Sequence, residues 1–166
     1  MNQKDQLTRV CTELGVDFDE LGVIVVDHGS RRAESNEALL QVVSEFQKST
    51  SYELVEPAHM ELAEPSIEQA FDRLVARGAR LVVVHPYFLL PGRHWAQDIP
   101  SLAASASARH PGIAHFVTSP LGIHSLMADI MHDRIQHCLS HVADLNESCQ
   151  LCDEKGRCRE QREQSR

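Results

Sequence analysis

The sequence lacks any apolar run close to the roughly 20 residues that a helix needs to cross a bilayer. Its first ten residues, MNQKDQLTRV, also lack the apolar centre of a signal peptide. Positive charge is in short supply, because 16 Lys and Arg stand against 24 Asp and Glu, for a formal net charge of −8. That balance argues against a general nucleic-acid or membrane-surface binder. We therefore expect a cytoplasmic protein with neither kind of partner.

A chain of 166 residues is long enough for one domain with a real core. Short apolar runs predict buried strands at Leu21–Val26 and Leu81–Val84. Two further strands are expected at Tyr52–Met60, where Pro57 weakens the pattern, and at Ile113–Val117. Helical patterns predict helices at Gln6–Leu14, Glu34–Lys48, Pro65–Ala76, from Asp98 to about Arg109, and at His124–Val142. In the fourth of these, Asp98 is expected to cap the first turn.

The alternation of strand and helix predicts an α/β fold, in which a four-stranded, mainly parallel sheet carries helices on both faces. We expect residues 1–20 to be an N-terminal extension and residues 21–145 to form this single domain. Residues 146–166 have almost no apolar side chains and are expected to be an appended polar tail.

Two histidines follow strands of the predicted sheet, and ligands of such sheets bind beyond the carboxyl ends of the strands. His28 comes directly after the first strand and before Gly29, and His94 lies in the long loop after the third. A neutral imidazole is a good ligand for iron, cobalt, nickel or zinc, and it also accepts protons near neutral pH. Glu61 ends the second strand on the same edge. We therefore expect His28, His94 and Glu61 to form a metal-binding or proton-transfer site.

Other residues near these strand ends leave alternatives open. Glu64 stands just before the helix predicted at Pro65, where a carboxylate complements the helix dipole, yet the sequence does not separate it from Glu61 as the site carboxylate. His59 could replace Glu61. His85 follows the third strand directly and is more typical of a structural residue than of a ligand.

Hydroxyl and guanidinium groups flank both histidines. Ser30 and Arg31 follow His28, and Arg93 precedes His94. Such groups suit the recognition of carboxylates or phosphates, although a solvated charged loop has the same composition. The HGSRR segment lacks the glycine density of a phosphate-binding loop, so a bound nucleotide is not expected.

Five cysteines are an odd number for a disulfide framework. Three of them form a C-x2-C-x5-C pattern in the polar tail: Cys149, Cys152 and Cys158. These thiols predict an iron–sulfur cluster or a zinc site, with Cys138, a histidine or another subunit as fourth ligand. The alternative is a polar tail with reactive thiols. His137 and His141 share a face of the last helix, which can bind metal but is more typical of a surface.

Three segments together resemble the short sirohydrochlorin chelatases of the CbiX and SirB type, within the class II tetrapyrrole chelatases. They are VDHGSR with Asn36, HMELAEPSIEQAF and VVVHPYFLLPGRHWAQDIP, and their order and spacing agree from about Gly22 to Val142. Tyr87, His85 and Pro91 depart from the usual pattern of that family, but both histidines are kept.

The resemblance implies a lyase that inserts Co²⁺ or Fe²⁺ into sirohydrochlorin without ATP, in cobalamin or siroheme biosynthesis, and it implies a homodimer. His28 and His94 would present the metal or take protons, assisted by Glu61. The carboxylates of sirohydrochlorin would be oriented by Ser30, Arg31 and Arg93. Cobalt is the first expectation, closely followed by iron.

The sequence leaves two further points open: the role of an apolar loop, and a function different from the one that the resemblance implies. The apolar YFLL loop and Trp95 could pack against the macrocycle or in the protein core. The competing function is a non-enzymatic metal-delivery or metal- and redox-sensing protein, which would use the histidine-rich last helix and the cysteine tail.

Overall fold

The computed structural model describes residues 3–143 of the chain. The described residues divide into two compact units, one ending at residue 122 and the other beginning at residue 123. In the first unit, the helices are α1 (Gln3–Glu13), α2 (Ala33–Ser49), α3 (Ile67–Ala76) and α4 (Ile99–Ser107), with a short 3-10 turn at Phe18–Glu20. Its strands are β1 (Leu21–Asp27), β2 (Leu54–His59), β3 (Leu81–Pro86) and β4 (Ala114–Val117). The described part of the second unit contains α5 (Ser125–Val142).

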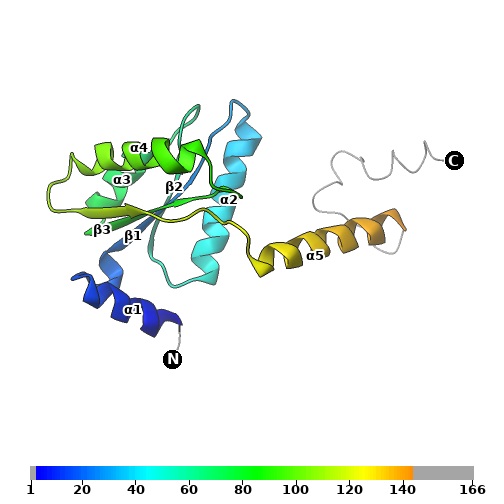
Figure 1. Cartoon of the computed structure of the whole chain (residues 1–166), viewed down its shortest axis with the longest axis horizontal. Helices are drawn as coiled ribbons and strands as arrows, with labels where there is room; N and C mark the ends of the chain where they lie inside the picture. The colour runs from blue at the N-terminus through cyan, green and yellow to red at the C-terminus, as the bar shows by residue number, and fades with distance from the viewer. Residues whose placement is uncertain (1–2, 144–166) are drawn as a thin grey trace. The chain divides into compact units, whose positions relative to one another are not determined.

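The four strands form one sheet in the order β2-β1-β3-β4, and every neighbouring pair is parallel. Helices α3 and α4 cover one face, while α1 and α2 pack on the other (Figure 1). The predicted α/β fold, with a four-stranded parallel sheet between helices, is therefore confirmed. In the described part of the chain, no helix has the length and apolar composition needed to span a membrane.

The central strand β1 is buried on both faces, which explains its unbroken apolar sequence. Ile24 and Val26 pack into the core beneath α3 and α4, whereas Val23 and Val25 pack against α2. Phe71 of α3 is fully buried in the first of these clusters. Burying a side chain of this size contributes about 1.5–3 kcal/mol, so the two faces of β1 anchor the sheet.

Local sequence adjusts the predicted boundaries. α3 begins at Ile67 rather than at Pro65, because Ser66 and Gln69 form a reciprocal capping box at its start. Pro57 lies inside β2, where it pairs with Val25, and this is tolerated because β2 is an edge strand. A π-helical turn at His94–Asp98, labelled η2, precedes α4 and was not predicted.

Candidate functional site

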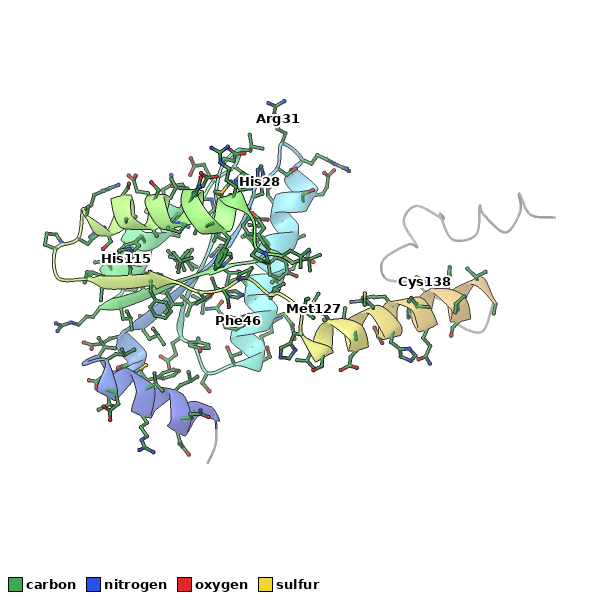
Figure 2. All side chains as sticks on the ribbon, in the orientation of Figure 1. His28, Arg31, Phe46, His115, Met127 and Cys138 are labelled. Atoms are coloured by element: carbon green, nitrogen blue, oxygen red, sulfur yellow. The ribbon has the colours of Figure 1, made fainter. Side chains whose placement is uncertain are left out.

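Three predicted site residues come together beyond the carboxyl ends of β1, β2 and β3. The Nε2 atom of His28 lies 2.9 Å from Oε1 of Glu61. The ring centroids of His28 and His94 are 5.1 Å apart, with the rings at 70° to each other. Each residue follows a different strand, so the parallel sheet is what gathers them. His28 lies in the loop between β1 and α2, as Figure 2 shows.

The position of Glu61 depends on backbone pairing beyond the strands. The amide of Met60 donates to the carbonyl of Asp27 at 2.8 Å, and the amide of Glu61 donates to the carbonyl of His28 at 3.1 Å. Gly29 stands at this close approach with φ +82°, and a Cβ atom there would lie 1.9 Å from the carbonyl oxygen of Glu61. Only glycine therefore fits between the two loops.

A buried polar pair supports the loop from below. His59 is 1% exposed, and its Nδ1 atom lies 2.5 Å from Oδ1 of Asp27. The same carboxylate oxygen accepts a hydrogen bond from the amide of Gly29 at 2.9 Å. His59 is thus engaged beneath the loop, while Glu61 faces His28. Local sequence does not predict this pair, because its members are 32 residues apart.

Both ring nitrogens of His28 face oxygen atoms. Nδ1 lies 3.2 Å from the carbonyl oxygen of Gly29, and Nε2 faces the carboxylate of Glu61. A carbonyl and a carboxylate can only accept hydrogen bonds. The close approach of Nε2 and Oε1 is therefore favourable when a proton or another cation lies between them. This arrangement can take up a cation or exchange a proton.

His94 and Asp98 lie at the two ends of η2. The Nδ1 atom of His94 is 2.8 Å from Oδ2 of Asp98, and the Asp98 side chain makes no capping hydrogen bond to α4. The predicted capping role of Asp98 is therefore wrong, because its carboxylate turns toward His94. The four-residue spacing of the two side chains was the signal in the sequence that could have revealed this pair.

Glu64 serves a different purpose from Glu61. Its Oε2 atom accepts a hydrogen bond from the amide of Ser66 at 3.2 Å, next to the start of α3. Of the two candidate carboxylates, Glu61 is the one that lies in contact with His28.

The polar residues around the histidines are placed differently from one another. Asn36 holds the loop after β1, since its side chain accepts from the amide of Ser30 and donates to the Ser30 carbonyl, both at 2.9 Å. The Ser30 hydroxyl accepts from the amide of Arg32 at 3.1 Å. Arg31 is exposed at the tip of this loop (Figure 2), and Arg93 is exposed just before η2.

A cavity of about 390 Å³ opens beside Glu61 and His94. It is lined by Met60, Glu61, His94, Asp98, Ser101 and Leu102. Large apolar side chains on the neighbouring loops face solvent, with Leu62 53%, Leu89 60% and Leu90 64% exposed. By contrast, Trp95 is half-buried and donates from Nε1 to the carbonyl of Thr118 at 2.8 Å. The edge of the sheet thus combines a cavity lined by both polar and apolar side chains with exposed apolar surface.

The described residues contain no group of three or more His, Cys, Asp or Glu side chains arranged to hold a metal ion. The absence applies to the neighbourhood of His137 on α5. It also applies to the predicted site, where His28 and Glu61 are in contact and His94 lies further away. The predicted cluster ligands, which are Cys149, Cys152 and Cys158, lie outside the described residues.

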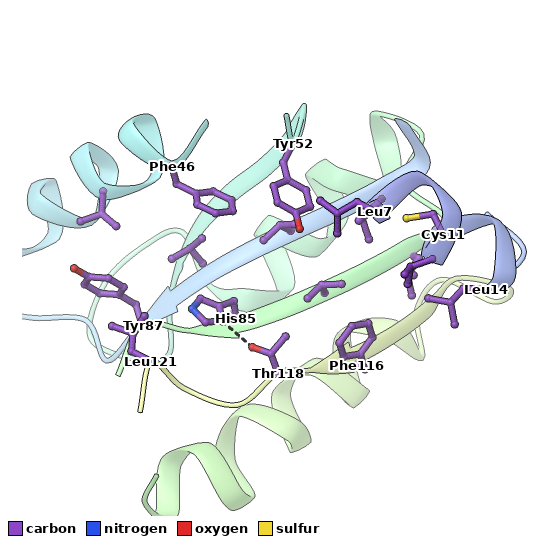
Figure 3. A pocket seen from close by; sticks show the side chains of 17 residues that line it. Leu7, Cys11, Leu14, Phe46, Tyr52, His85, Tyr87, Phe116, Thr118 and Leu121 are labelled. Carbon is purple, nitrogen blue, oxygen red and sulfur yellow. Dashed lines mark hydrogen bonds between the residues drawn. The ribbon is translucent and has the colours of Figure 1, made fainter. Parts of the chain in front are cut away.

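A second cavity, of about 470 Å³, lies on the face of the sheet that α1 and α2 partly cover (Figure 3). Its lining is mostly apolar and includes Phe46, Tyr52 and Phe116. His85 lies in this lining, and its Nδ1 atom is 2.7 Å from Oγ1 of Thr118. Burial lowers the pKa of His85 below its ordinary value of 6.5. The structure therefore keeps His85 on a different face from His28 and His94.

Comparison with known proteins gives consistent matches. The CbiX family model matches residues 22–138. The chain is 54% identical over 141 residues to the chloroplastic sirohydrochlorin ferrochelatase of Arabidopsis thaliana, a match that spans 85% of this chain and 63% of that protein. It is 31% identical over 120 residues to the sirohydrochlorin cobaltochelatase of Sulfolobus acidocaldarius, spanning 72% of this chain and 94% of that protein.

Solved structures match the fold in the same way. SirB from Bacillus subtilis subspecies spizizenii, in complex with cobalt, has a TM-score of 0.66 and 29% identity, covering 70% of this chain and 50% of that one. A CbiX protein described as putative, from Marinobacter aquaeolei, has a TM-score of 0.63 and 27% identity, covering 73% of this chain and 98% of that one. The chain spans less than two thirds of the Arabidopsis relative's length.

Proposed function

The chain belongs to the CbiX family, and from that membership we propose that it is a sirohydrochlorin chelatase, a lyase that inserts Co²⁺ or Fe²⁺ into the tetrapyrrole without ATP. The observation that carries this proposal is the convergence of His28, Glu61 and His94 beside an open cavity of about 390 Å³. Nitrogen and carboxylate ligands accept both metals.

The metal ion is a substrate in this reaction, so the site must hold it and then release it. Two imidazoles and one carboxylate supply good ligands, yet the three groups do not close around a point in the described structure. An open set of ligands leaves coordination positions for water and then for the pyrrole nitrogens. His28 and His94 would hold the ion at the mouth of the cavity while the macrocycle replaces its waters.

Insertion also moves protons. The free tetrapyrrole carries two pyrrole N–H groups, and the ion M²⁺ replaces both protons, which leave as two H⁺. The His28–Glu61 pair is built around a proton or cation between Nε2 and Oε1, at 2.9 Å. Once the ion has passed to the macrocycle, the pair can accept a pyrrole proton and pass it to solvent.

The loops around the site suit a flat substrate with acidic side groups. Arg31 and Arg93 are exposed on two loops beside the histidines, where they can bind carboxylates. Ser30 lies in the same loop as Arg31, although its hydroxyl already accepts from a backbone amide. The exposed Leu89 and Leu90 offer apolar surface for the macrocycle. A local cationic edge would allow an acidic protein to bind an acidic substrate.

Several narrower predictions accompany this proposal. Relatives named as cobaltochelatases and as ferrochelatases both match, and cobalt remains the first expectation. A homodimer is supported by the match to half of the SirB chain, because a second copy would supply the other half.

The cytoplasmic location stays a prediction, as the plant relative is named chloroplastic. An iron–sulfur or zinc site at Cys149, Cys152 and Cys158 also stays a prediction.

The test is anaerobic absorbance spectroscopy of sirohydrochlorin with purified protein and Co²⁺ or Fe²⁺. Wild type should accelerate metallation above the spontaneous rate, whereas His28→Ala and His94→Ala should lose about 100-fold or more of that rate. His115→Ala, which removes a half-buried histidine from β4, is the matched control and should keep it. The faster metal would decide between cobalt and iron.

The competing delivery or sensing function makes a different prediction. Under that hypothesis the protein binds Co²⁺ or Fe²⁺ but does not accelerate metallation, and deletion of the chain from Asn146 onward removes the metal binding. A chelatase should retain its basal activity after the same deletion. Metal binding by wild type without acceleration would therefore overturn the proposal.

A further inference from the structure

Asp98 has no part in the function proposed above, although it lies in the same cavity as Glu61 and His94. Its Oδ2 atom is 2.8 Å from Nδ1 of His94, and the Asp98 side chain is 37% exposed. It does not cap α4. The contact with His94 is therefore what this carboxylate does in the structure.

An ionised carboxylate has acceptors only, so the proton of a neutral His94 must lie on Nδ1 and point at Asp98. The lone pair is then on Nε2, the nitrogen that remains available to a ligand. A histidine without such a partner exchanges freely between its two tautomers, and only one of these exposes Nε2 as a ligand.

The backbone around His94 holds the two side chains on one side of the turn. In η2 the amide of Ile99 donates to the carbonyl of His94, five residues back, in the π-helical pattern. The indole of Trp95 donates to the carbonyl of Thr118 at 2.8 Å, which ties the turn to the end of β4. Such turns are frequent at functional sites. The His94–Asp98 contact thus sits on an anchored turn.

His28 has a different set of partners from His94. Its Nδ1 atom faces the carbonyl of Gly29 at 3.2 Å, and its Nε2 atom faces the carboxylate of Glu61 at 2.9 Å. Both rings therefore have Nδ1 against an oxygen acceptor, but the carboxylate partner lies at Nε2 in His28 and at Nδ1 in His94. The tautomer argument therefore applies to His94.

We propose that Asp98 is a positioning residue, which fixes His94 in the Nδ1–H tautomer and so keeps Nε2 ready for the metal substrate. The purpose of this tautomer rests on the proposed function, whereas the contact between Asp98 and His94 does not. Partners of this kind orient metal-binding histidines and raise their affinity, and their loss typically lowers metal affinity or activity about 10- to 100-fold.

The experiment compares Asp98→Ala and Asp98→Asn with wild type and with Asp72→Asn. Asp72 is the control, because its Oδ1 atom pairs with Nε2 of His110 at 2.6 Å in a second Asp–His contact, which is part-buried. The tautomer of His94 is read by ¹⁵N NMR of the imidazole in metal-free protein at a single pH. Co²⁺ affinity and sirohydrochlorin metallation are measured on the same samples.

We expect wild type and Asp72→Asn to show the Nδ1–H tautomer at His94. Asp98→Ala and Asp98→Asn should show loss of that preference and a Kd for Co²⁺ raised about 10- to 100-fold. If one variant fails to fold, the other carries the test. An unchanged tautomer together with a Kd within about twofold of wild type would overturn the positioning role, whatever the metallation rates.

The two proposals fail separately in this design. If wild type does not accelerate metallation while the tautomer and Co²⁺ affinity still depend on Asp98, the chelatase proposal falls and the positioning role stands. If metallation is fast in wild type and in both Asp98 variants with an unchanged tautomer, the positioning role falls and the chelatase proposal stands.

Discussion

Two histidines that belong to the same stretch of chain, His85 and His94, occupy opposite environments. His85 is the fifth residue of β3 and lines an apolar cavity of about 470 Å³, with the hydroxyl of Thr118 as its partner. His94 lies beyond the strand, beside a cavity of about 390 Å³ that also contains the carboxylates of Glu61 and Asp98. Burial lowers the pKa of His85 below 6.5, whereas His94 contacts the carboxylate of Asp98.

The difference comes from position relative to the sheet rather than from residue type. Inside β3 the side chains alternate, so Val84 joins the core under α3 and α4 while His85 points to the other face. Beyond Pro86 the chain leaves the sheet, and the loop can carry His94 over the strand ends. The side chain of a histidine inside a parallel strand must point to one face of the sheet. A histidine in the loop after the strand can instead lie beside residues that follow other strands.

Gly29→Ala should lower stability more than the other changes considered below, because it disrupts the site of His28, Glu61 and His94 while leaving the apolar cavity of about 470 Å³ intact. The left-handed φ of +82° and the contact with the Glu61 carbonyl both oppose a Cβ atom. We expect unfolding free energy to fall by about 2–5 kcal/mol, combining backbone strain and overpacking. Urea denaturation measures this, and Co²⁺ titration should show lost binding.

Gly15→Ala is the matched control for that change. Gly15 has a similar φ of +77°, but nothing lies within 4 Å of the added Cβ atom. It should lose about 1–2 kcal/mol through the backbone alone and should keep Co²⁺ binding. Equal losses in the two variants would show that the close approach of the two loops is not what requires glycine.

His85→Leu should change the pH dependence of stability without affecting the site of His28, Glu61 and His94, because His85 lines the apolar cavity of about 470 Å³. Because burial lowers the pKa of His85 below 6.5, the unfolded chain takes up a proton before the folded protein as pH falls. The free energy of unfolding of wild type therefore falls as pH drops from 6.5 to the lowered pKa of the folded state. Above pH 6.5 both states carry a neutral His85, and this loss does not occur.

The leucine variant cannot take up that proton, so its stability should fall less than that of wild type between pH 7.5 and pH 5. Denaturant midpoints across this range measure the effect. The Thr118 hydroxyl keeps its contact with the carbonyl of Ser119 at 2.9 Å. Parallel pH curves for the two proteins would show that His85 titrates as it does in water.

Arg31→Ala should have the weakest effect of these variants, and it tests whether substrate binding extends from His28 to the tip of its loop. Arg31 is exposed at a loop tip, where a single ion pair contributes up to about 1 kcal/mol. We expect KM for sirohydrochlorin to rise up to about fivefold with kcat unchanged, and less so at high salt. Arg32→Ala is the control, because Arg32 faces Glu34 at 3.9 Å. Equal effects would assign the change to net charge alone.

Much of the fold could be predicted because burial dictates it. β1 is apolar at every position from Val23 to Val26, and only a strand covered on both faces requires that. The sequence also indicated that His28, Glu61 and His94 follow three different strands, which is enough to place them at one edge of a parallel sheet.

The remaining features depend on contacts that local sequence does not encode. The Asp27–His59 pair joins residues from two strands, and the register of β1 and β2 decides that they meet. Asp98 precedes Ile99 and Pro100 as a capping residue would, so the local pattern favoured a cap. The π-helical turn reversed this, because it brings the Asp98 carboxylate to His94 instead.

The backbone pairing between the loops after β1 and β2 has a consequence for how such proteins diversify. Position 61 is located by main-chain hydrogen bonds and by the absence of a side chain at Gly29, not by the glutamate itself. Another side chain at position 61 would still face His28. In the proposed function, where Glu61 assists at the metal, substitution there would exchange a hard oxygen ligand for a softer nitrogen or sulfur ligand without rebuilding the scaffold. Under that proposal, metal preference would change through this one side chain while the backbone of the two loops stays the same.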